Sequence, residues 1–309
     1  MSTAPIVIVG SLSDDHARAI HDGLRERGHE PYVLDAQRFP EELSIALGDA
    51  LDDVVIDGRP LGRPAAAYVR GLYQSPASFG VDADEAMKDD WRRTLAAFRE
   101  RSTVLAAVLL RWEQLGTALY NPTLAANNIT KPYQLALLQA AGLPVPVTLW
   151  SNDPEAVLRF CREREAIYKP VSGGAMTRRV EPRDLEPERL QRLRTAPVCF
   201  QELLPGDDIR VYVLDGRVIC AMRIVSDAID FRQNEQRIEP IEISRAVEAQ
   251  CIRAAEVIGL RYTGMDLKAD RDGAYKILEL NPSAMFLGFE FHAGVDIKGP
   301  LCDALLSHV

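Results

Sequence analysis

The stretch Ile277-Leu278-Glu279-Leu280-Asn281-Pro282 is the most informative part of the sequence. Successive side chains of a β-strand point to opposite faces, so Glu279 and Asn281, two residues apart, lie on the same face. Upstream, Asp266 stands among apolar residues, and the turn at Gly273 predicts that its strand lies beside that of Glu279. Three oxygen-bearing side chains are therefore expected to converge on one face of a sheet.

Such a set of side chains indicates a magnesium site. Mg²⁺ prefers hard oxygen ligands and is usually held by one or two carboxylates, with phosphates and water in its other positions. The alternative is a solvated strand face, but acids within buried apolar runs are rarely unpaired. We therefore predict that Asp266, Glu279 and Asn281 are metal ligands.

A second pattern suits phosphate binding. Lys169 ends an apolar strand and is followed by a short run of small residues. The ammonium group supplies a point charge, while Ser172, Gly173 and Gly174 can turn backbone N–H groups toward phosphate oxygens. Lys131 is a second candidate cation. The alternatives are an ordinary glycine loop and a surface lysine.

A third pattern lies where one strand ends, a glycine turn follows, and the next strand opens with Asp208 and Arg210 on one face. The planar guanidinium of Arg210 suits phosphoryl oxygens and would stabilise charge that develops during transfer. Arg223, on the following strand, is expected across from it as a second catalytic group; a cross-strand salt bridge is the alternative.

The order of elements predicts an α/β (α+β) fold. A buried strand at 6–9, a helix at 14–27 and a strand at 31–34 indicate a parallel sheet. No GxGxxG motif follows the first strand, which argues against a dinucleotide site of the usual kind. From Val198 onward, short strands and hairpin turns indicate an antiparallel sheet. The expected units are an N-terminal α/β domain (1–117), a central small domain (118–195) and a C-terminal antiparallel-sheet domain (196–309).

Composition narrows the class of protein. The 309 residues carry a net charge of −9, which disfavours nucleic-acid binding, and no run approaches the roughly 18 apolar residues of a membrane span. The five cysteines include no CxxC pair, so we expect a cytoplasmic protein without a disulfide framework. The amphipathic segment 91–112 is expected to pack internally, with a dimer face as the alternative, and a homodimer is the default assembly.

Five segments follow one another along the chain: Tyr168-Lys169-Pro170, Gln201-Glu202-Leu203, Asp208-Ile209-Arg210, Gly264-Met265-Asp266 and Glu279-Leu280-Asn281-Pro282. In this order they resemble the ATP-grasp superfamily. The likeness is nearest to the RimK-type glutamate ligases and to the microviridin-type (graspetide) peptide ligases, and it covers about residues 120 to 297. Asp35 and the later Phe39-Pro40 resemble the second strand region of the graspetide ligases.

The resemblance implies an ATP-grasp fold that uses ATP and Mg²⁺, with two ions expected and Mn²⁺ able to replace them. It implies that Lys131 and Lys169 contact the phosphates and that Arg210 lies near the transferred phosphoryl group. It also implies that the strand formed by Gln201, Glu202, Leu203 and Leu204 lines the adenine, that Glu202 or Asp208 holds the adenine or ribose, and that Asp266, Glu279 and Asn281 bind magnesium.

The activity implied is ligation through an acyl phosphate. The first reading is a ligase that forms side-chain ester or amide links in a ribosomal precursor peptide with a leader. The second is a RimK-like ligase that adds a free amino acid, and the third is a noncatalytic ATP-binding module. The stretch 282–286 lacks the Asn-Gly pair common in microviridin-type ligases, so the acceptor stays open.

Overall fold

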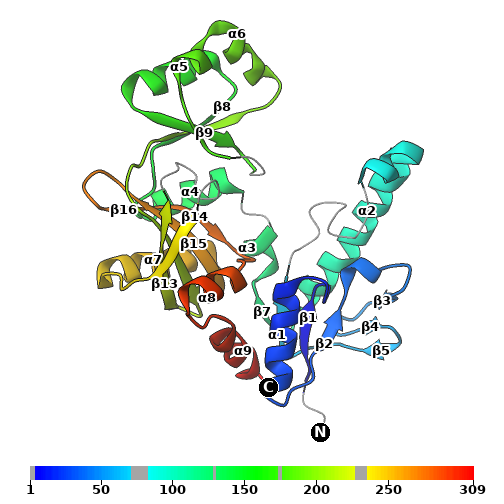
Figure 1. The fold of residues 1–309 in the computed structure, drawn as a ribbon. Helices are drawn as coiled ribbons and strands as arrows, with labels where there is room; N and C mark the ends of the chain where they lie inside the picture. Colours follow the sequence, from blue (N-terminus) through cyan, green and yellow to red (C-terminus); the bar gives the residue numbers. More distant parts are fainter. Residues whose placement is uncertain (1–3, 71–82, 128–129, 173–175, 227–234) are drawn as a thin grey trace.

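The computed structural model describes residues 4–70, 83–127, 130–172, 176–226 and 235–309. Figure 1 shows an N-terminal unit in blue and cyan, a central unit in green, and an antiparallel sheet in yellow and orange with the C-terminal helices beside it. In the part of the chain so described, no helix combines the length and the apolar character needed to cross a membrane.

The N-terminal unit is built on a parallel sheet, as predicted. Its strands are apolar and buried because, in a parallel sheet, helices cover the faces. The carboxylate of Asp14 accepts from the backbone N–H groups of His16 and Ala17 and so caps the first helix. In spatial order the strands are β2 (Tyr32–Leu34), β1 (Ile6–Val9), β6 (Ala66–Val69) and β7 (Ala118–Tyr120), and the helices of this unit are α1 (Asp15–Glu26) and α2 (Ala83–Gln114).

Helix α2 packs through its C-terminal half. Trp112 is fully buried, and its Nε1 donates to the Leu61 carbonyl oxygen at 2.9 Å. Trp91 and Leu95, nearer the start of the helix, are each 50% exposed. The internal packing expected for this segment therefore holds for its second half, while the homodimer stays a prediction. A small antiparallel sheet packs nearby: β3 (Ile45–Leu47), β4 (Val54–Ile56) and β5 (Arg59–Pro60).

The central unit is a four-stranded antiparallel sheet. Strand β11 (Val198–Glu202), which the sequence placed in the last domain, hydrogen-bonds here with β8 (Thr148–Ser151) and β9 (Ala166–Pro170). Strand β7 likewise lies with the first sheet, although the predicted boundary precedes it. The three-domain division itself stays a prediction. In spatial order the strands are β10 (Arg178–Arg179), β9 (Ala166–Pro170), β11 (Val198–Glu202) and β8 (Thr148–Ser151), with helices α5 (Pro154–Glu163) and α6 (Pro187–Leu190).

The largest sheet has five antiparallel strands. Asp215 and Gly216 both have positive φ and form the hairpin turn predicted between two of them. One face packs on helices α4 (Lys131–Ala140) and α7 (Arg245–Ile258) through a buried apolar cluster. In spatial order the strands are β14 (Glu235–Pro240), β13 (Arg217–Ser226), β12 (Asp208–Leu214), β15 (Tyr262–Ala269) and β16 (Tyr275–Asn281). The remaining helices are α3 (Thr123–Asn127), α4 (Lys131–Ala140), α7 (Arg245–Ile258), α8 (Leu287–Ala293) and α9 (Lys298–Leu306).

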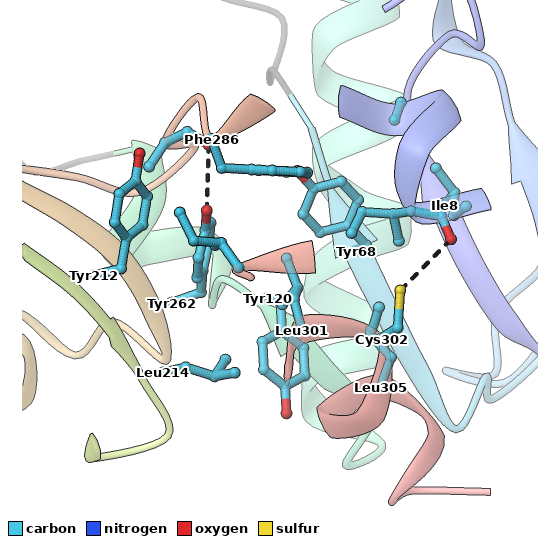
Figure 2. Close-up of a cluster of buried hydrophobic side chains, with 14 of the residues drawn as sticks. Ile8, Tyr68, Tyr120, Tyr212, Leu214, Tyr262, Phe286, Leu301, Cys302 and Leu305 are labelled. Carbon is cyan, nitrogen blue, oxygen red and sulfur yellow. Dashed lines mark hydrogen bonds between the residues drawn. The ribbon is translucent and has the colours of Figure 1, made fainter. Parts of the chain in front are cut away.

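The N-terminal unit and the large sheet share one core. Figure 2 shows Ile8 and Tyr68 from the parallel sheet packed in the same cluster as Tyr212 and Tyr262 from the antiparallel sheet. Side chains of α9 complete this cluster. The shared burial fixes the two sheets relative to each other, because separating them would expose large aromatic surfaces to water.

Asn121 joins the same two parts through hydrogen bonds. Its side chain is 1% exposed, and its Oδ1 accepts from the N–H groups of Arg261 and Tyr262, both at 2.8 Å. Its Nδ2 donates to the carbonyl oxygens of Tyr262 at 2.7 Å and Pro282 at 2.5 Å. One buried amide therefore ties the end of β7 to the start of β15 and to the turn after β16.

We expect Asn121→Ala to lower the free energy of unfolding by about 3 kcal/mol, because several buried backbone groups lose their partner. Urea unfolding followed by circular dichroism measures this change. Asn152→Ala, at an exposed position, is the matched control and should change stability by less than about 0.5 kcal/mol. Equal stability of the two variants would contradict a joining role for Asn121.

Candidate functional site

A cavity of about 340 Å³ lies between the central sheet and the five-stranded sheet. Lysines from α4 and β9 and the acidic side chains of three neighbouring strands face into it, so residues far apart in sequence meet there. The predicted site residues that line the cavity are Lys131, Lys169, Gln201, Glu202, Leu203, Leu204, Asp208, Arg210, Asp266, Glu279 and Asn281.

The charged residues form a row across three strands. Arg210 on β12 lies opposite Asp266 on β15, which lies opposite Glu279 on β16. Opposed residues of antiparallel strands share a face, so the row points into the cavity. Arg210 Nε lies 3.1 Å from Asp266 Oδ1, and the Asn281 amide donates to Asp266 Oδ2 at 3.3 Å. The predicted convergence of the three oxygen-bearing side chains is what the structure has.

The two carboxyl groups of this row have shifted pKa values. Burial raises the pKa of Asp266 to about 6, and the nearby Glu279 and Asp208 carboxylates add to the rise, against the opposing effect of Arg210. For Glu279, burial also acts to raise the pKa, but the Lys131 ammonium outweighs it and the pKa is lowered. Two close carboxylates that need cations to stay ionised favour the binding of a metal ion.

The donor set fits magnesium. It consists of two carboxylates and one amide, and within the described residues no group of three His, Cys, Asp or Glu side chains is placed to hold a metal. Asp266 Oδ1 is buried and accepts no hydrogen bond, despite its short distance to Arg210. Because Mg²⁺ takes few protein ligands when phosphates supply the rest, Asp266, Glu279 and Asn281 are sufficient.

The candidate phosphate-binding groups are only partly brought together. Lys131, at the start of α4, pairs with Glu279, and Lys169 donates to Gln201 Oε1 at 3.2 Å. Both ammonium groups lie close enough to the acidic row for their positive charges to lower the pKa of Glu279. Ser172 is exposed and is not among the residues that line the cavity. Gly173 and Gly174 lie outside the described residues.

Two further ion pairs involve acidic residues that line the cavity. Lys276 Nζ donates to Glu202 Oε1 at 2.6 Å, and the same oxygen accepts from the backbone N–H of Val147 at 2.9 Å. Lys268 Nζ lies 2.5 Å from Asp208 Oδ2. The sequence reading did not name Lys268, although its position two residues after Asp266 on one strand placed it on the same face.

Arg223 does not accompany Arg210, contrary to the expected arrangement. Its cross-strand partner is Ile209, which packs in the core beneath α7, whereas Arg210 is opposite Met222. Alternation along the strand therefore turns Arg223 to the opposite face of the sheet. There its Nε lies 3.1 Å from Asp207 Oδ2, which corresponds to the salt-bridge alternative.

A glycine makes room for Arg210. Gly264 is opposite Tyr212 on the neighbouring strand, and a Cβ added to it would lie 3.0 Å from Arg210 Nη1 and 2.8 Å from Ala284 Cβ. The guanidinium carbon of Arg210 lies 5.0 Å from the centre of the Phe289 ring. Arg210 is thus held between an aromatic face and a carboxylate, which leaves it little freedom.

Arg70 of the N-terminal unit contacts a residue that lines the cavity. Its Nη1 donates to the carbonyl oxygen of Ser283 at 2.6 Å and to its Oγ at 2.7 Å, and its Nε donates to Asp14 at 3.1 Å. Ser283 lines the cavity directly after the strand of Asn281. The sequence offered no signal for this contact, because Arg70 and Ser283 are brought together only by tertiary packing.

Comparison with known proteins places this geometry in a family. A model described as a RimK-like ATP-grasp domain matches residues 198–305. The structure of the ATP-grasp ligase PsnB, complexed with a phosphomimetic variant of minimal precursor, Mg and ADP, is 63% identical over 99% of each chain, with a TM-score of 0.94. A probable alpha-L-glutamate ligase of Thioalkalivibrio sulfidiphilus (strain HL-EbGR7) is 28% identical over 207 residues, which is 62% of this chain and 68% of that protein.

A more distant structure shares the fold. The macrocyclase MdnC from Microcystis aeruginosa MRC, bound with precursor peptide MdnA, is 23% identical over 98% of this chain and 99% of that chain, with a TM-score of 0.83. The predicted ATP-grasp fold and ligase class are therefore confirmed. With close identity to PsnB along nearly its whole length, this protein belongs to the ATP-grasp ligases.

Proposed function

We propose that this protein uses ATP and Mg²⁺ to activate side-chain carboxylates of a ribosomally made precursor peptide and joins them to amines or hydroxyls of the same peptide. The observation that carries the proposal is the row of Arg210, Asp266 and Glu279 beside two lysines in one cavity. PsnB, which is 60% identical in a second complex, is seen there with precursor peptide PsnA2 and AMPPNP. A peptide substrate with a leader is therefore the substrate class we assign.

The chain's own groups account for the charge that phosphoryl transfer must stabilise. Lys131 and Lys169 bind phosphoryl oxygens of ATP, and Arg210 contacts the oxygens of the group in transfer. Asp266, Glu279 and Asn281 would hold Mg²⁺, which would supply further positive charge to the phosphates. The strand of Gln201, Glu202, Leu203 and Leu204, with Asp208, forms the end of the cavity that we assign to the adenine and ribose.

The proposed ligation has two steps. A carboxylate oxygen of the peptide takes the γ-phosphoryl group of ATP, which gives an acyl phosphate and ADP. An amine or hydroxyl attacks the carbonyl carbon, phosphate leaves, and the nucleophile loses its proton to form an amide or ester. Neither step requires a nucleophilic side chain from the protein, and the thiols of Cys199 and Cys220 have pKa values raised by burial, which makes them poor nucleophiles.

A second candidate is a RimK-like ligase that adds a free amino acid to a protein or small molecule. The curated relatives named as probable alpha-L-glutamate ligases favour it, at 26–29% identity. The noncatalytic ATP-binding module is disfavoured by the complete set of charged groups in the cavity. We assign the protein to the cytoplasm, where its five free cysteines stay reduced.

Mass spectrometry of the product separates the two enzymatic candidates. With ATP, Mg²⁺ and a precursor peptide rich in Glu, Asp, Lys, Ser or Thr encoded beside the gene, we expect the peptide to lose one water per link as ADP forms. Gain of an amino-acid residue from an added free amino acid would instead support the RimK-like alternative. ADP formation with neither product would contradict both.

Glu279→Gln tests the metal site. The change keeps the shape but removes a ligand charge, and we expect turnover to fall at least about 100-fold because the charge on the phosphates is no longer offset. Magnesium-dependent release of ADP is the measurement, with circular dichroism to confirm folding. Glu256→Gln on the exposed surface of α7 is the control; equal activity of the two variants would refute the assignment.

We expect substitution of Arg210 to lower turnover and substitution of Arg223 to leave it nearly unchanged. Arg210→Lys keeps a positive charge but loses the planar fork, so we expect turnover to fall at least about 30-fold with the KM for ATP changed less. Arg223→Lys, on the opposite face of the sheet, should stay within about threefold of the parent. Steady-state kinetics of both variants decide this, and a larger loss for Arg223→Lys would restore the role first expected for it.

A further inference from the structure

The strand that carries Glu279 and Asn281 lies at the edge of the five-stranded sheet. β16 pairs with β15 on one side, and among the described strands of this sheet none lies beyond it. An edge strand directs alternate N–H and C=O groups outward, where they need partners if they are buried. Leu280, between the two candidate ligands, is only 3% exposed, so water does not supply those partners.

The side chain of Gln134 supplies them. Its Oε1 accepts from the Leu280 N–H at 2.8 Å, and its Nε2 donates to the Leu280 carbonyl oxygen at 3.0 Å. Gln134 is 5% exposed, so both bonds are made in a buried place. The primary amide thus pairs with the backbone of β16 in the way a neighbouring strand would.

The same helix face also reaches a candidate ligand directly. Lys131 lies three residues before Gln134 on α4, and residues at this spacing are neighbours on a helix surface. Its Nζ pairs with the side chain of Glu279. Helix α4, which lies against β16, therefore holds both a ligand carboxylate and the backbone next to it (Figure 1).

The pairing between β15 and β16 is irregular next to Glu279, so β16 needs the hydrogen bonds from Gln134 as well. The register shifts between Asp266 and Leu267, where Asp266 pairs with Glu279 but Leu267 pairs with Ile277, so Leu278 has no partner on β15. A bulge disrupts the ladder locally and re-aims the neighbouring side chains. At this irregular place, β15 alone fixes the direction of Glu279 poorly, and the bonds from Gln134 restrain the strand from its other side.

We propose that Gln134 is a positioning residue that sets the affinity of the site for a divalent metal by fixing Leu280, and with it the directions of Glu279 and Asn281. The inference rests on the metal role given to those two residues under the proposed function. Residues that orient metal ligands without touching the metal affect metal affinity strongly, and their removal typically lowers the affinity about 10- to 100-fold.

The test is titration of the full-length protein with Mn²⁺ in the presence of ADP, followed by electron paramagnetic resonance of free Mn²⁺. We expect Gln134→Leu to weaken Mn²⁺ binding at least about 10-fold. Excess Mg²⁺ should then restore most of kcat, because the ligands themselves are intact. Gln139→Leu, at an exposed position of the same helix, is the matched control and should bind Mn²⁺ as the parent does.

Gln134→Glu is the second variant in case Gln134→Leu does not fold. It keeps an acceptor for the Leu280 N–H but loses the donor to the carbonyl oxygen, so we expect an intermediate loss of Mn²⁺ affinity. Thermal unfolding of each metal-free variant provides the readout for a merely structural role. A lower melting temperature with unchanged Mn²⁺ affinity would overturn the proposal.

Glu279→Gln in the same titration separates this inference from the proposed function. If Glu279→Gln loses Mn²⁺ binding while Gln134→Leu retains it, the positioning role is wrong and the metal site stands. If Glu279→Gln also binds Mn²⁺ like the parent, the metal assignment fails, and both proposals fall with it.

Discussion

The repulsion between Asp266 and Glu279, held opposite each other on adjacent strands, is the constraint that the rest of the site satisfies. Two carboxylates at this spacing in a partly buried place are costly unless positive charge is near. Arg210 from the next strand and Lys131 from α4 provide it. The cations and the acids come from different elements of the fold and lie close together in the cavity, where both metal and phosphate groups find charges of opposite sign.

A buried apolar cluster outside the site fixes the positions of those elements relative to one another. The core shared between the parallel and antiparallel sheets, with Tyr68 and Tyr212 in one cluster, prevents the sheets from sliding relative to each other. Asn121 and Arg70 then act on the turn after β16, through the carbonyl oxygens of Pro282 and Ser283. The residues that follow Asn281 are thus fixed by the N-terminal unit, which contributes to the cavity without supplying a candidate metal ligand.

The two sides of the cavity are formed by different sheets, each with its own apolar cluster. The five-stranded sheet carries the row of charges on three hydrogen-bonded strands, and α4 and α7 cover its other face. The central sheet, with Lys169 and Glu202, has its own smaller apolar cluster and faces the row across the cavity. The central sheet thus adds Lys169 to a cavity whose other cations, Arg210 and Lys131, lie with the oxygen ligands on the side of the five-stranded sheet.

The sequence by itself determined the strands, their side-chain alternation and the kinds of groups in the site. Period-two spacing put Glu279 with Asn281, and the turn at Gly273 brought Asp266 beside them, since hairpin pairing is a local property. The same local reasoning was wrong for Arg223. The face of the sheet on which Arg223 lies depends on the register between β12 and β13, and a shift of one residue moves a side chain to the other face.

Only the tertiary structure decided the long-range partners. Gln134 clamps Leu280, Arg70 holds Ser283, and β11 joins the central sheet instead of the large one. These contacts join segments far apart in the chain, and their residue types are ordinary in the sequence. The local sequence does not determine which distant backbone group a buried amide or guanidinium binds. That partner is determined by how the sheets and helices pack against one another.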